Sequence, residues 1–401
     1  MFEPCITHQI QNPLEYLIQE GFFVRVSFEQ NAGFPPVDFV WGAQSAARCA
    51  MRRHRRPRQP MTTFTPLPAT MQAIVHDGFG PPSVLRAAQL PLPQLRPHDL
   101  LVRVRAAGLN RAELNWRQGK YGPTPGFGDS DAVIGLELAG EVVAMGPQVQ
   151  GFALGERVMG IVGGGAYAQY ARMDAGMAMK VPDSLSDVEA ATIPEAMVTA
   201  HHVLLHLGQL QAGERVLLHG AGGGVGTTLL QMARMAGAAT VVTTSSAGKL
   251  ARLSAFGADI TVDYASQDFA EVIAAQVSGG RVDLVIDNMG APYLERNVRS
   301  LDVGGRLIQL GLQGGASATL PLDLVLTRRL RIEGTVMKSL TSEQKAQMTQ
   351  RFAQRWLPVI AARQLLPPIA RRFALQDAAQ AHQCLEEGQP FGKLVLECPW
   401  E

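Results

Sequence analysis

Cysteine is scarce in this sequence, and its scarcity removes several kinds of protein from consideration. The 401-residue chain holds four cysteines, Cys5, Cys49, Cys384 and Cys398, and no two of them form a C-x-x-C pair. A cysteine-rich zinc lobe and a disulfide framework are therefore both excluded. This cysteine usage is typical of a reducing compartment, so we expect the protein to be cytoplasmic.

Long apolar runs and an excess of charge of either sign are also missing. No apolar run reaches the ~18 residues of a membrane span, so we expect no membrane partner. The formal net charge is +1, which gives no reason to expect a nucleic acid or an anionic surface as a partner.

Residues 1–70 differ in composition from the rest of the chain, because they contain no lysine and crowd six arginines between Arg48 and Arg58. Such an arginine run binds nucleic acid or an acidic partner in some proteins. We favour two other interpretations, a disordered extension or a translation start at Met61 or Met71, because Met71 begins a regular pattern of strands. We therefore expect residues 1–70 to be disordered or not translated.

A glycine-rich turn between a strand and a helix organises the middle of the chain. Residues 216–218 are an apolar run typical of a buried strand, and residues 227–237 carry apolar side chains at helical spacing. Glycines between them allow a sharp turn and the close approach of a ligand. The free N–H groups at the start of the helix suit a pyrophosphate, although the motif alone also fits a tight turn without a ligand.

Strands and helices alternate from this turn to Gly311. The predicted strands that follow the first are 240–244, 259–263, 282–287 and 305–311, and a predicted helix precedes each of them. Such alternation implies right-handed βαβ crossovers and a doubly wound parallel sheet, which is an α/β Rossmann fold. A glycine turn after the first strand of such a sheet is typical of a dinucleotide site.

The end of the second strand indicates which dinucleotide binds. An NAD enzyme usually holds its ribose with an Asp or Glu about 20 residues past the glycines. Here the first acidic residue after Gly226 is Asp259, whereas Ser245, Ser246 and Lys249 offer hydroxyl groups and a positive charge. A 2′-phosphate would meet donors in place of a carboxylate, so we predict NADPH.

A β-rich segment precedes the Rossmann part, and one more strand follows it. Residues 71–76 and 100–106 alternate as half-buried strands do, and the β character ends near Pro182. A predicted strand at 392–397 comes after a long helix, so we expect the C-terminal part to rejoin the first domain. The predicted domains are a β-rich catalytic domain at 71–190, the Rossmann domain at 191–334, and the return to the catalytic domain at 335–401.

Several motifs together resemble the zinc-free quinone oxidoreductase (zeta-crystallin-like) branch of the medium-chain dehydrogenase/reductase superfamily. The run from 213 to 234 is similar to the signature of that branch along its whole length. The stretches 109–113, 117–121 and 193–195 are similar to the tumour-suppressor-inducible quinone oxidoreductase subgroup. The resemblance covers residues 71–397, and it implies a GroES-like catalytic domain with an inserted Rossmann domain.

The resemblance also predicts a catalytic site without a metal. Zinc-dependent members have a cysteine near the position of Asn110 and a Gly-His-Glu where this chain has Gly135-Leu136-Glu137. Leucine cannot bind zinc, and residues 50–383 contain no cysteine. Neighbouring helical residues point about 100° apart, so we interpret His201 and His202 as core or surface histidines.

Individual site residues are likewise implied by the resemblance. Tyr121 and Asn110 would lie beside the nicotinamide, where Tyr121 would either donate a proton to the acceptor oxygen or pack against the cofactor. The implied cofactor-binding residues are Thr199 near the nicotinamide ribose or amide, Gly222, Gly223, Gly224, Val225 and Gly226 at the pyrophosphate, Ser245, Ser246, Lys249 and Tyr264 at the adenosine phosphate, and Asn288, Gly311, Leu312 and Lys393 on flanking loops. Similar members carry a serine at the position of Gly223, so this chain lacks that hydroxyl group.

The implied activity is hydride transfer from NADPH to a quinone, because a quinone spreads the arriving charge onto oxygen and needs only polar groups and a proton source. An alternative in the same class is reduction of the double bond of an enone, alkenal or enoyl thioester. An alternative of another class is an NADPH-binding protein that acts by binding RNA or a partner, which only the arginine run supports.

The segment from Arg331 to Thr335 is expected at an edge of the Rossmann sheet. Pairing of two such edges across a two-fold axis would cover unpaired backbone groups, so the resemblance implies a homodimer. The alternative is that the chain's own C-terminal segment covers this edge of the sheet.

Overall fold

The computed structural model describes residues 67–122, 133–388 and 390–398, all of which lie in one compact unit. Most of the N-terminal segment 1–70, with its arginine run, lies outside the described residues, so its interpretation stays a prediction. Among the helices of the described part, none combines the length and the apolar character that a membrane span requires.

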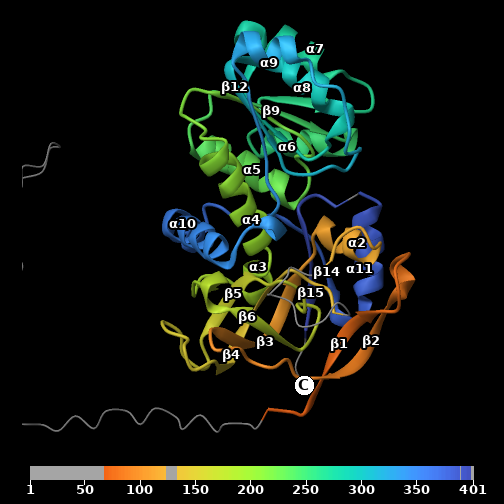
Figure 1. The fold of residues 1–401 in the computed structure, drawn as a ribbon, viewed down its shortest axis with the longest axis vertical. Coiled ribbons are helices and arrows are strands. Elements are labelled where there is room, and N and C mark those ends of the chain that lie inside the picture. The colour runs from red at the N-terminus through yellow and green to blue at the C-terminus, as the bar shows by residue number, and fades with distance from the viewer. Residues whose placement is uncertain (1–66, 123–132, 389, 399–401) are drawn as a thin grey trace, which may run out of the picture. The chain divides into compact units, whose positions relative to one another are not determined.

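A six-stranded parallel sheet forms the Rossmann domain (Figure 1). Its strands are β8 (Arg215–Leu218), β9 (Thr240–Ser245), β10 (Ile260–Asp263), β11 (Val282–Asp287), β12 (Leu301–Gln309) and β13 (Arg331–Gly334). The spatial order is β10-β9-β8-β11-β12-β13, and every neighbouring pair is parallel. The order therefore reverses between β8 and β11, which is where doubly wound sheets bind ligands at their carboxyl edge. The predicted α/β fold class is confirmed.

Helices cover both faces of this sheet because its strands are apolar on both sides. They are α4 (Pro194–His201) with the π-helical turn η3 (His202–Leu207), α5 (Gly224–Met235), α6 (Leu250–Ala255), α7 (Phe269–Gln276), α8 (Leu294–Ser300) and α9 (Leu322–Arg328). Val216 and Leu218 of β8 pack in one buried cluster with the apolar side chains of α5. Leu217 between them packs on the opposite face with Phe269 and Ile273 of α7.

The β-rich domain contains a seven-stranded sheet and a separate two-stranded sheet. The larger sheet has the strands β3 (Asp99–Gly108), β4 (Glu137–Met145), β5 (Arg157–Ile161), β6 (Tyr170–Asp174), β7 (Ala178–Lys180), β14 (Ile369–Ala374) and β15 (Lys393–Glu397), and the smaller pairs β1 (Thr70–His76) with β2 (Leu85–Pro91). The C-terminal strand β15 pairs antiparallel with β3, with Leu396 opposite Ala107. The chain thus returns to its first sheet after the Rossmann strands, while the exact domain limits stay a prediction.

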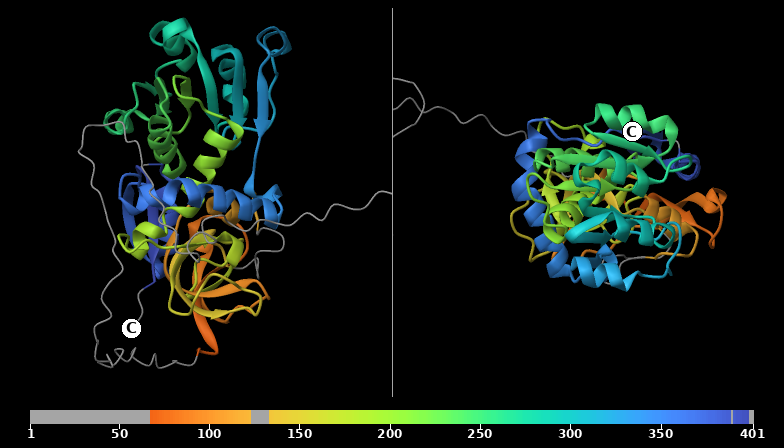
Figure 2. Two further views of the ribbon diagram at one scale, coloured as in Figure 1. Left: turned by 90° about the vertical axis from the view of Figure 1, so that its left-hand side faces the viewer. Right: turned by 90° about the horizontal axis from the view of Figure 1, so that it is seen from above.

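Four further helices accompany the β-rich sheet. They are α2 (Arg111–Arg117), α3 (Asp187–Ala190), α10 (Ser342–Ala361) and α11 (Ala378–Glu386). The long helix α10 packs on α4 and also against β7 and the 3₁₀ turn Ala175–Met177, so it lies between the two sheets (Figures 1 and 2). Its Trp356 indole N–H donates to Nδ1 of His201 at 3.0 Å. His201 is therefore a hydrogen-bonded core residue, and burial lowers its pKa to about 4.

Candidate functional site

The glycine turn leads from β8 into α5, as the sequence predicts. A Cβ on Gly226 would lie 2.5 Å from Cα of Ala221, so only glycine allows α5 to approach the turn this closely. A Cβ on Gly222 would lie 2.5 Å from Cδ of Lys249. Gly223, in contrast, has open space, because its nearest non-neighbouring atom would lie 3.8 Å away. The turn and the free N–H groups of the first turn of α5 form a cradle that fits a pyrophosphate.

The residues predicted at the adenosine phosphate gather at the carboxyl ends of β9 and β10. Ser245 is the last residue of β9 and is buried, and Ser246 follows it. The backbone N–H of Tyr264, which follows β10, donates to the carbonyl oxygen of Ser245 at 3.2 Å. The side chain of Lys249 extends past Gly222 and donates from Nζ to the carbonyl oxygen of Gly388 at 2.6 Å.

Positive charge accumulates around Lys249. Burial lowers the pKa of its ammonium group, and the neighbouring charges of Arg111 and Arg252 lower it further. Two arginine charges therefore act on Lys249 in addition to its burial. Such a group of cations fits an anion such as a 2′-phosphate.

The carboxyl ends of β11 and β12 carry the next predicted positions. The side-chain oxygen of Asn288 is buried and has no hydrogen-bond partner among the described residues. A Cβ on Gly220 would lie 2.7 Å from the Asn288 amide nitrogen, so this amide lies beside the phosphate turn. Gly311 packs against Asn288, and the side chain of Leu312 is exposed. A buried acceptor without a partner fits a site that a polar ligand completes.

Lys393 connects the turn to a second polar cluster. The resemblance places it on a flanking loop, but it is the first residue of β15, so that placement is wrong and the predicted strand at 392–397 is confirmed. Its buried Nζ donates to the carbonyl oxygen of Leu109 at 2.8 Å, to Oδ1 of Asn110 at 2.6 Å and to Oε1 of Glu137 at 2.5 Å. A Cβ on Gly224 would lie 2.4 Å from Cδ of Lys393, so the lysine stem lies against the phosphate turn.

The backbone also joins the turn to β15. The N–H of Gly392 donates to the carbonyl oxygen of Gly222 at 3.0 Å, and Gly392 forms a parallel bridge with Gly223. Gly392 has a φ of +96°, and a Cβ there would lie 2.0 Å from the carbonyl oxygen of Pro368. The C-terminal strand is therefore held directly at the phosphate turn.

Asn110 is the N-cap of α2 and is held by carboxylates on two elements. Its backbone N–H donates to Oε2 of Glu113 at 2.8 Å, and its side-chain amide donates to Oε1 of Glu137 at 2.9 Å. Glu113 also accepts from the backbone N–H of Leu136 at 3.1 Å. Burial raises the pKa of Glu113 to about 7, opposed by Lys393 and assisted by Glu137.

A third carboxylate comes from α4. The backbone N–H of Glu195 donates to Oε2 of Glu137 at 2.8 Å. Burial raises the pKa of the Glu195 carboxyl to about 8, and the charges of Glu137 and Glu113 add to the increase against the effect of Lys393. This carboxyl group is therefore largely protonated at neutral pH.

Tyr121 borders the same cluster. Burial raises the pKa of Tyr121 above its usual range, and the negative charges of Glu195 and Glu113 raise it further. Nζ of Lys338 lies 5.1 Å from the centre of the Tyr121 ring. Thr199 lies one helical turn after Glu195 on α4. Of the predicted residues, the arrangement brings together Asn110, Tyr121 and Lys393, and it adds Glu113, Glu137 and Glu195.

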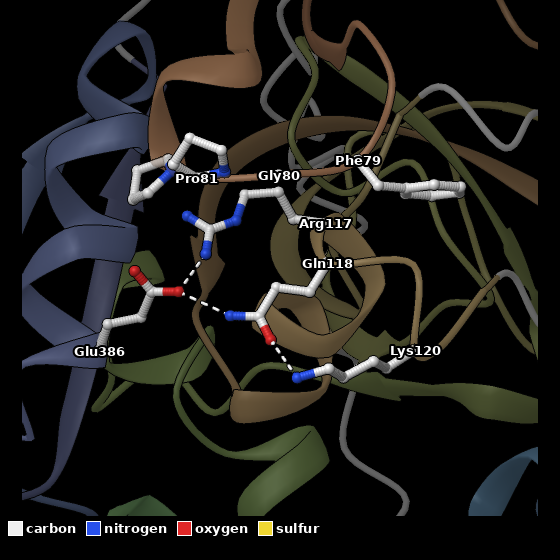
Figure 3. A pocket seen from close by; sticks show the side chains of 8 residues that line it. Phe79, Gly80, Pro81, Arg117, Gln118, Lys120 and Glu386 are labelled. Carbon is white, nitrogen blue, oxygen red and sulfur yellow. Dashed lines mark hydrogen bonds and ion pairs between the residues drawn. The ribbon is translucent and has the colours of Figure 1, made fainter.

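One pocket lies at the other end of α2, and it contains none of the predicted site residues (Figure 3). Its volume is about 400 Å³, and its lining includes Arg117, Gln118, Lys120 and Glu386. The buried Arg117 guanidinium forms an ion pair with Glu386 of α11, which also accepts from Gln118 Nε2 at 2.9 Å. These contacts fix the end of α2, from which the chain continues to Tyr121.

Metal-ligating residues do not cluster in the part of the chain that the structure describes. Within it, no group of three or more His, Cys, Asp or Glu side chains is arranged to hold a metal ion. At the position where zinc-dependent relatives have a ligand histidine, Leu136 is buried in the apolar core of the β-rich domain.

Two protein families match the two domains in sequence. The alcohol dehydrogenase GroES-like domain matches residues 96–183, and the zinc-binding dehydrogenase family matches residues 224–354. The probable quinone oxidoreductase of Schizosaccharomyces pombe is 30% identical over 322 residues, which are 80% of this chain and 94% of that protein. The chain belongs to the medium-chain dehydrogenase/reductase superfamily. It has the GroES-like domain and the Rossmann domain of that superfamily, whose members bind a nicotinamide cofactor.

Other proteins resemble the chain in part or in whole. A phenolphthiocerol/phthiocerol polyketide synthase of Mycobacterium tuberculosis is 35% identical over 298 residues, which are 74% of this chain. The chain spans only 13% of that synthase. The structure of mycobacterial Rv1454c complexed with NADPH has a TM-score of 0.72 and 29% identity, and the match covers 82% of this chain and 99% of that one.

Proposed function

We propose that this protein reduces a quinone by hydride transfer from NADPH, at a site without a bound metal. The observation that carries the proposal is the link between the phosphate turn and the polar cluster. Gly392 binds the carbonyl oxygen of Gly222, and the next residue, Lys393, binds Asn110 and Glu137. The match to a probable quinone oxidoreductase over nearly its whole length supports a quinone as the acceptor.

The polar groups of the cluster suit this reaction. Bound NADPH would supply the hydride, and the acceptor oxygen would then carry negative charge. The side chain of Asn110 is fully engaged by Lys393, Glu137 and Glu113, so it keeps one orientation. No hydrogen bond among the described residues engages the Tyr121 hydroxyl group, which leaves it available to the acceptor oxygen.

The Lys393 ammonium group supports a reaction without metal. It lies within 2.5 Å of Oε1 of Glu137 and donates to two further oxygens, so a protein cation already neutralises this buried carboxylate. A divalent ion at the same oxygens would have to displace it.

The proposal is tested by following NADPH oxidation with ortho- and para-quinones, alkenals and enoyl-CoAs, each with and without a chelator. We expect quinone turnover that survives chelation. Loss of turnover on chelation would contradict the metal-free site, and absence of turnover with every acceptor despite tight NADPH binding would favour a protein that acts by binding RNA or a partner.

A second candidate function is reduction of the double bond of an enoyl thioester. The observation that favours it is the 35% identity to a polyketide synthase over 298 residues. Both reactions combine a hydride from NADPH with a proton, so the same cluster serves either one. Turnover confined to enoyl-CoAs or alkenals in the same assay would select this function.

The preference for NADPH depends on Lys249. We expect Lys249→Ala to weaken NADPH binding by about 10- to 100-fold, because one charge-assisted hydrogen bond contributes about 1.5–3 kcal/mol. Binding of NADH should change little, since it lacks the 2′-phosphate. The two dissociation constants, measured by nicotinamide fluorescence, check this expectation, and an equal loss for both cofactors would remove Lys249 from the phosphate site.

We also propose a homodimer through β13. This strand is at an edge of the sheet, and β13 and α9 expose Ile332, Leu322 and Leu326 to 38%, 69% and 78%. Exposed apolar side chains near the edge of a sheet are typical of an interface. Light scattering should give twice the chain mass, and Leu326→Glu should give the monomer mass; a wild-type monomer would contradict the proposal.

A further inference from the structure

Helix α4 turns one narrow face away from the core. Six of its eight residues, Pro194 to His201, are buried. The other two, Glu195 and Thr199, are half-buried, and they are four residues apart, so they lie on the same side of the helix. This face carries Thr199, which is predicted to contact the nicotinamide, and Glu195, which has no predicted role.

The Glu195 backbone is fixed, whereas its carboxyl group is available. Its N–H donates to the buried carboxylate of Glu137, which Lys393 also binds. Among the described residues, no hydrogen bond or ion pair engages the Glu195 carboxyl group itself. The charged groups that act on this carboxyl group come from three other elements: Glu113 from α2, Glu137 from β4 and Lys393 from β15, with Tyr121 after α2 as the remaining titratable group.

We propose that Glu195 is a catalytic proton donor, which protonates the acceptor oxygen after hydride transfer in the reaction proposed above. Two electrons reach the acceptor with the hydride. The O–H bond of Glu195 then breaks as a new O–H bond forms on the acceptor oxygen, and the Glu195 carboxylate that remains takes a proton from water through its half-exposed side. The proton transfer itself involves no change of oxidation state.

The surroundings favour Glu195 over Tyr121 as the donor. Burial and the adjacent carboxylates raise the pKa of Glu195 to about 8, so that it is protonated yet able to give up its proton near neutral pH. Burial, with the charges of Glu195 and Glu113, raises the pKa of Tyr121 well above its usual range, so that its phenolate is disfavoured. Tyr121 is therefore better suited to orient the acceptor oxygen than to ionise.

The test compares Glu195→Gln, Glu195→Asp and a matched control, Glu271→Gln on the exposed surface of α7, with para-benzoquinone and NADPH. Glutamine keeps the shape of the side chain but has no acidic proton. We expect Glu195→Gln to lower kcat about 100-fold, within the range for loss of general acid catalysis, with little change in KM or NADPH affinity. Glu195→Asp should restore part of kcat, and Glu271→Gln should behave as wild type.

A pH profile and an infrared titration provide independent readouts. Wild-type kcat should fall as the pH rises through about 8, because the carboxyl group then loses its proton, and this fall should be absent in Glu195→Gln. Infrared difference spectra of the free protein should show the protonated carboxyl bands of Glu113 and Glu195 in wild type and Glu271→Gln. Glu195→Gln should lose one of these bands and keep the other, that of Glu113.

The outcomes separate this inference from the function on which it rests. Wild-type turnover with an unchanged kcat and pH profile in Glu195→Gln would overturn the donor and leave the quinone reductase intact. A protonated carboxyl signal of the same total intensity in Glu195→Gln as in wild type would overturn a protonated Glu195 whatever the turnover. Absence of wild-type turnover with every quinone would overturn the proposed function, and the donor role with it.

Discussion

Replacing Lys393 with methionine is expected to lower the free energy of unfolding by about 3–5 kcal/mol, because removal of one partner from a buried ion pair leaves an uncompensated charge. The ammonium group is 2% exposed, and the Glu137 carboxylate that it pairs with is fully buried. The variant also leaves the carbonyl oxygen of Leu109 and Oδ1 of Asn110 without their donor.

The loss of stability in Lys393→Met should depend on pH in a defined direction. Lys393 lowers the pKa values of Glu113 and Glu195, which burial raises to about 7 and about 8, so its removal raises both further. A carboxyl group whose pKa is higher in the folded than in the unfolded chain binds its proton more tightly in the folded chain. The free energy of unfolding therefore falls as the pH rises and this proton is lost. The deficit of Lys393→Met should therefore be smaller at pH 5 than at pH 9.

Urea denaturation at the two pH values measures this effect. The control is Lys180→Met, which removes an exposed ion pair with Glu156 and should cost less than about 1 kcal/mol. Adding Glu137→Gln to Lys393→Met should recover a large part of the lost stability, because it removes the unpaired charge. If the single variants Lys393→Met and Lys180→Met have the same free energy of unfolding, the stability of the cluster does not depend on the Lys393 ammonium group.

Gly226→Ala is expected to destabilise the protein by about 1–3 kcal/mol and to weaken NADPH binding at least tenfold. The added Cβ would lie 2.5–2.7 Å from Cα and C of Ala221 and O of Gly220, all of them backbone atoms that cannot rotate away. Helix α5 would have to move from the turn, and its N-terminal N–H groups would move with it.

Gly223→Ala is the matched control three residues earlier. Its Cβ would meet only the carbonyl oxygen of Gly220 at 3.8 Å, and the backbone φ of −89° suits any residue. We expect its stability to stay within about 0.5 kcal/mol of wild type. Thermal denaturation and nicotinamide fluorescence compare the two variants, and equal effects would contradict a packing role that is specific to Gly226.

The parallel sheet could be predicted because its evidence is local. The apolar run of β8, the glycines and the amphipathic helix α5 are consecutive, and each predicted strand of the Rossmann domain has a counterpart in the structure. Strands β2 and β14 and helix α11 were not predicted. β2 ends at Pro91 and pairs along its length only with β1, so its sequence shows little of the alternation that marks a half-buried strand.

The polar cluster could be predicted only in part, because its partners are distant in sequence. Lys393 lies 283 residues from Asn110 and 256 residues from Glu137, and no pattern in the sequence connects these positions. The one local signal is the spacing of Asn110 and Glu113, which form a capping box at the start of α2. The donor candidate Glu195 stands out in the sequence only as part of the resemblance at 193–195, and its altered pKa comes from burial and from charged side chains on three other elements.

The pairing of β15 with β3 has a consequence for the order of folding. Lys393 reaches Leu109 across 284 residues, so the β-rich sheet closes only when the ends of a very long loop meet. The entropic cost of closing a loop rises with its effective length. Contacts between residues that are far apart in the sequence therefore form slowly. Folding of the Rossmann segment first would shorten that loop to a compact, ordered insert. We therefore expect amide hydrogens of β8 and α5 to gain protection from exchange during refolding before those of β3 and β15.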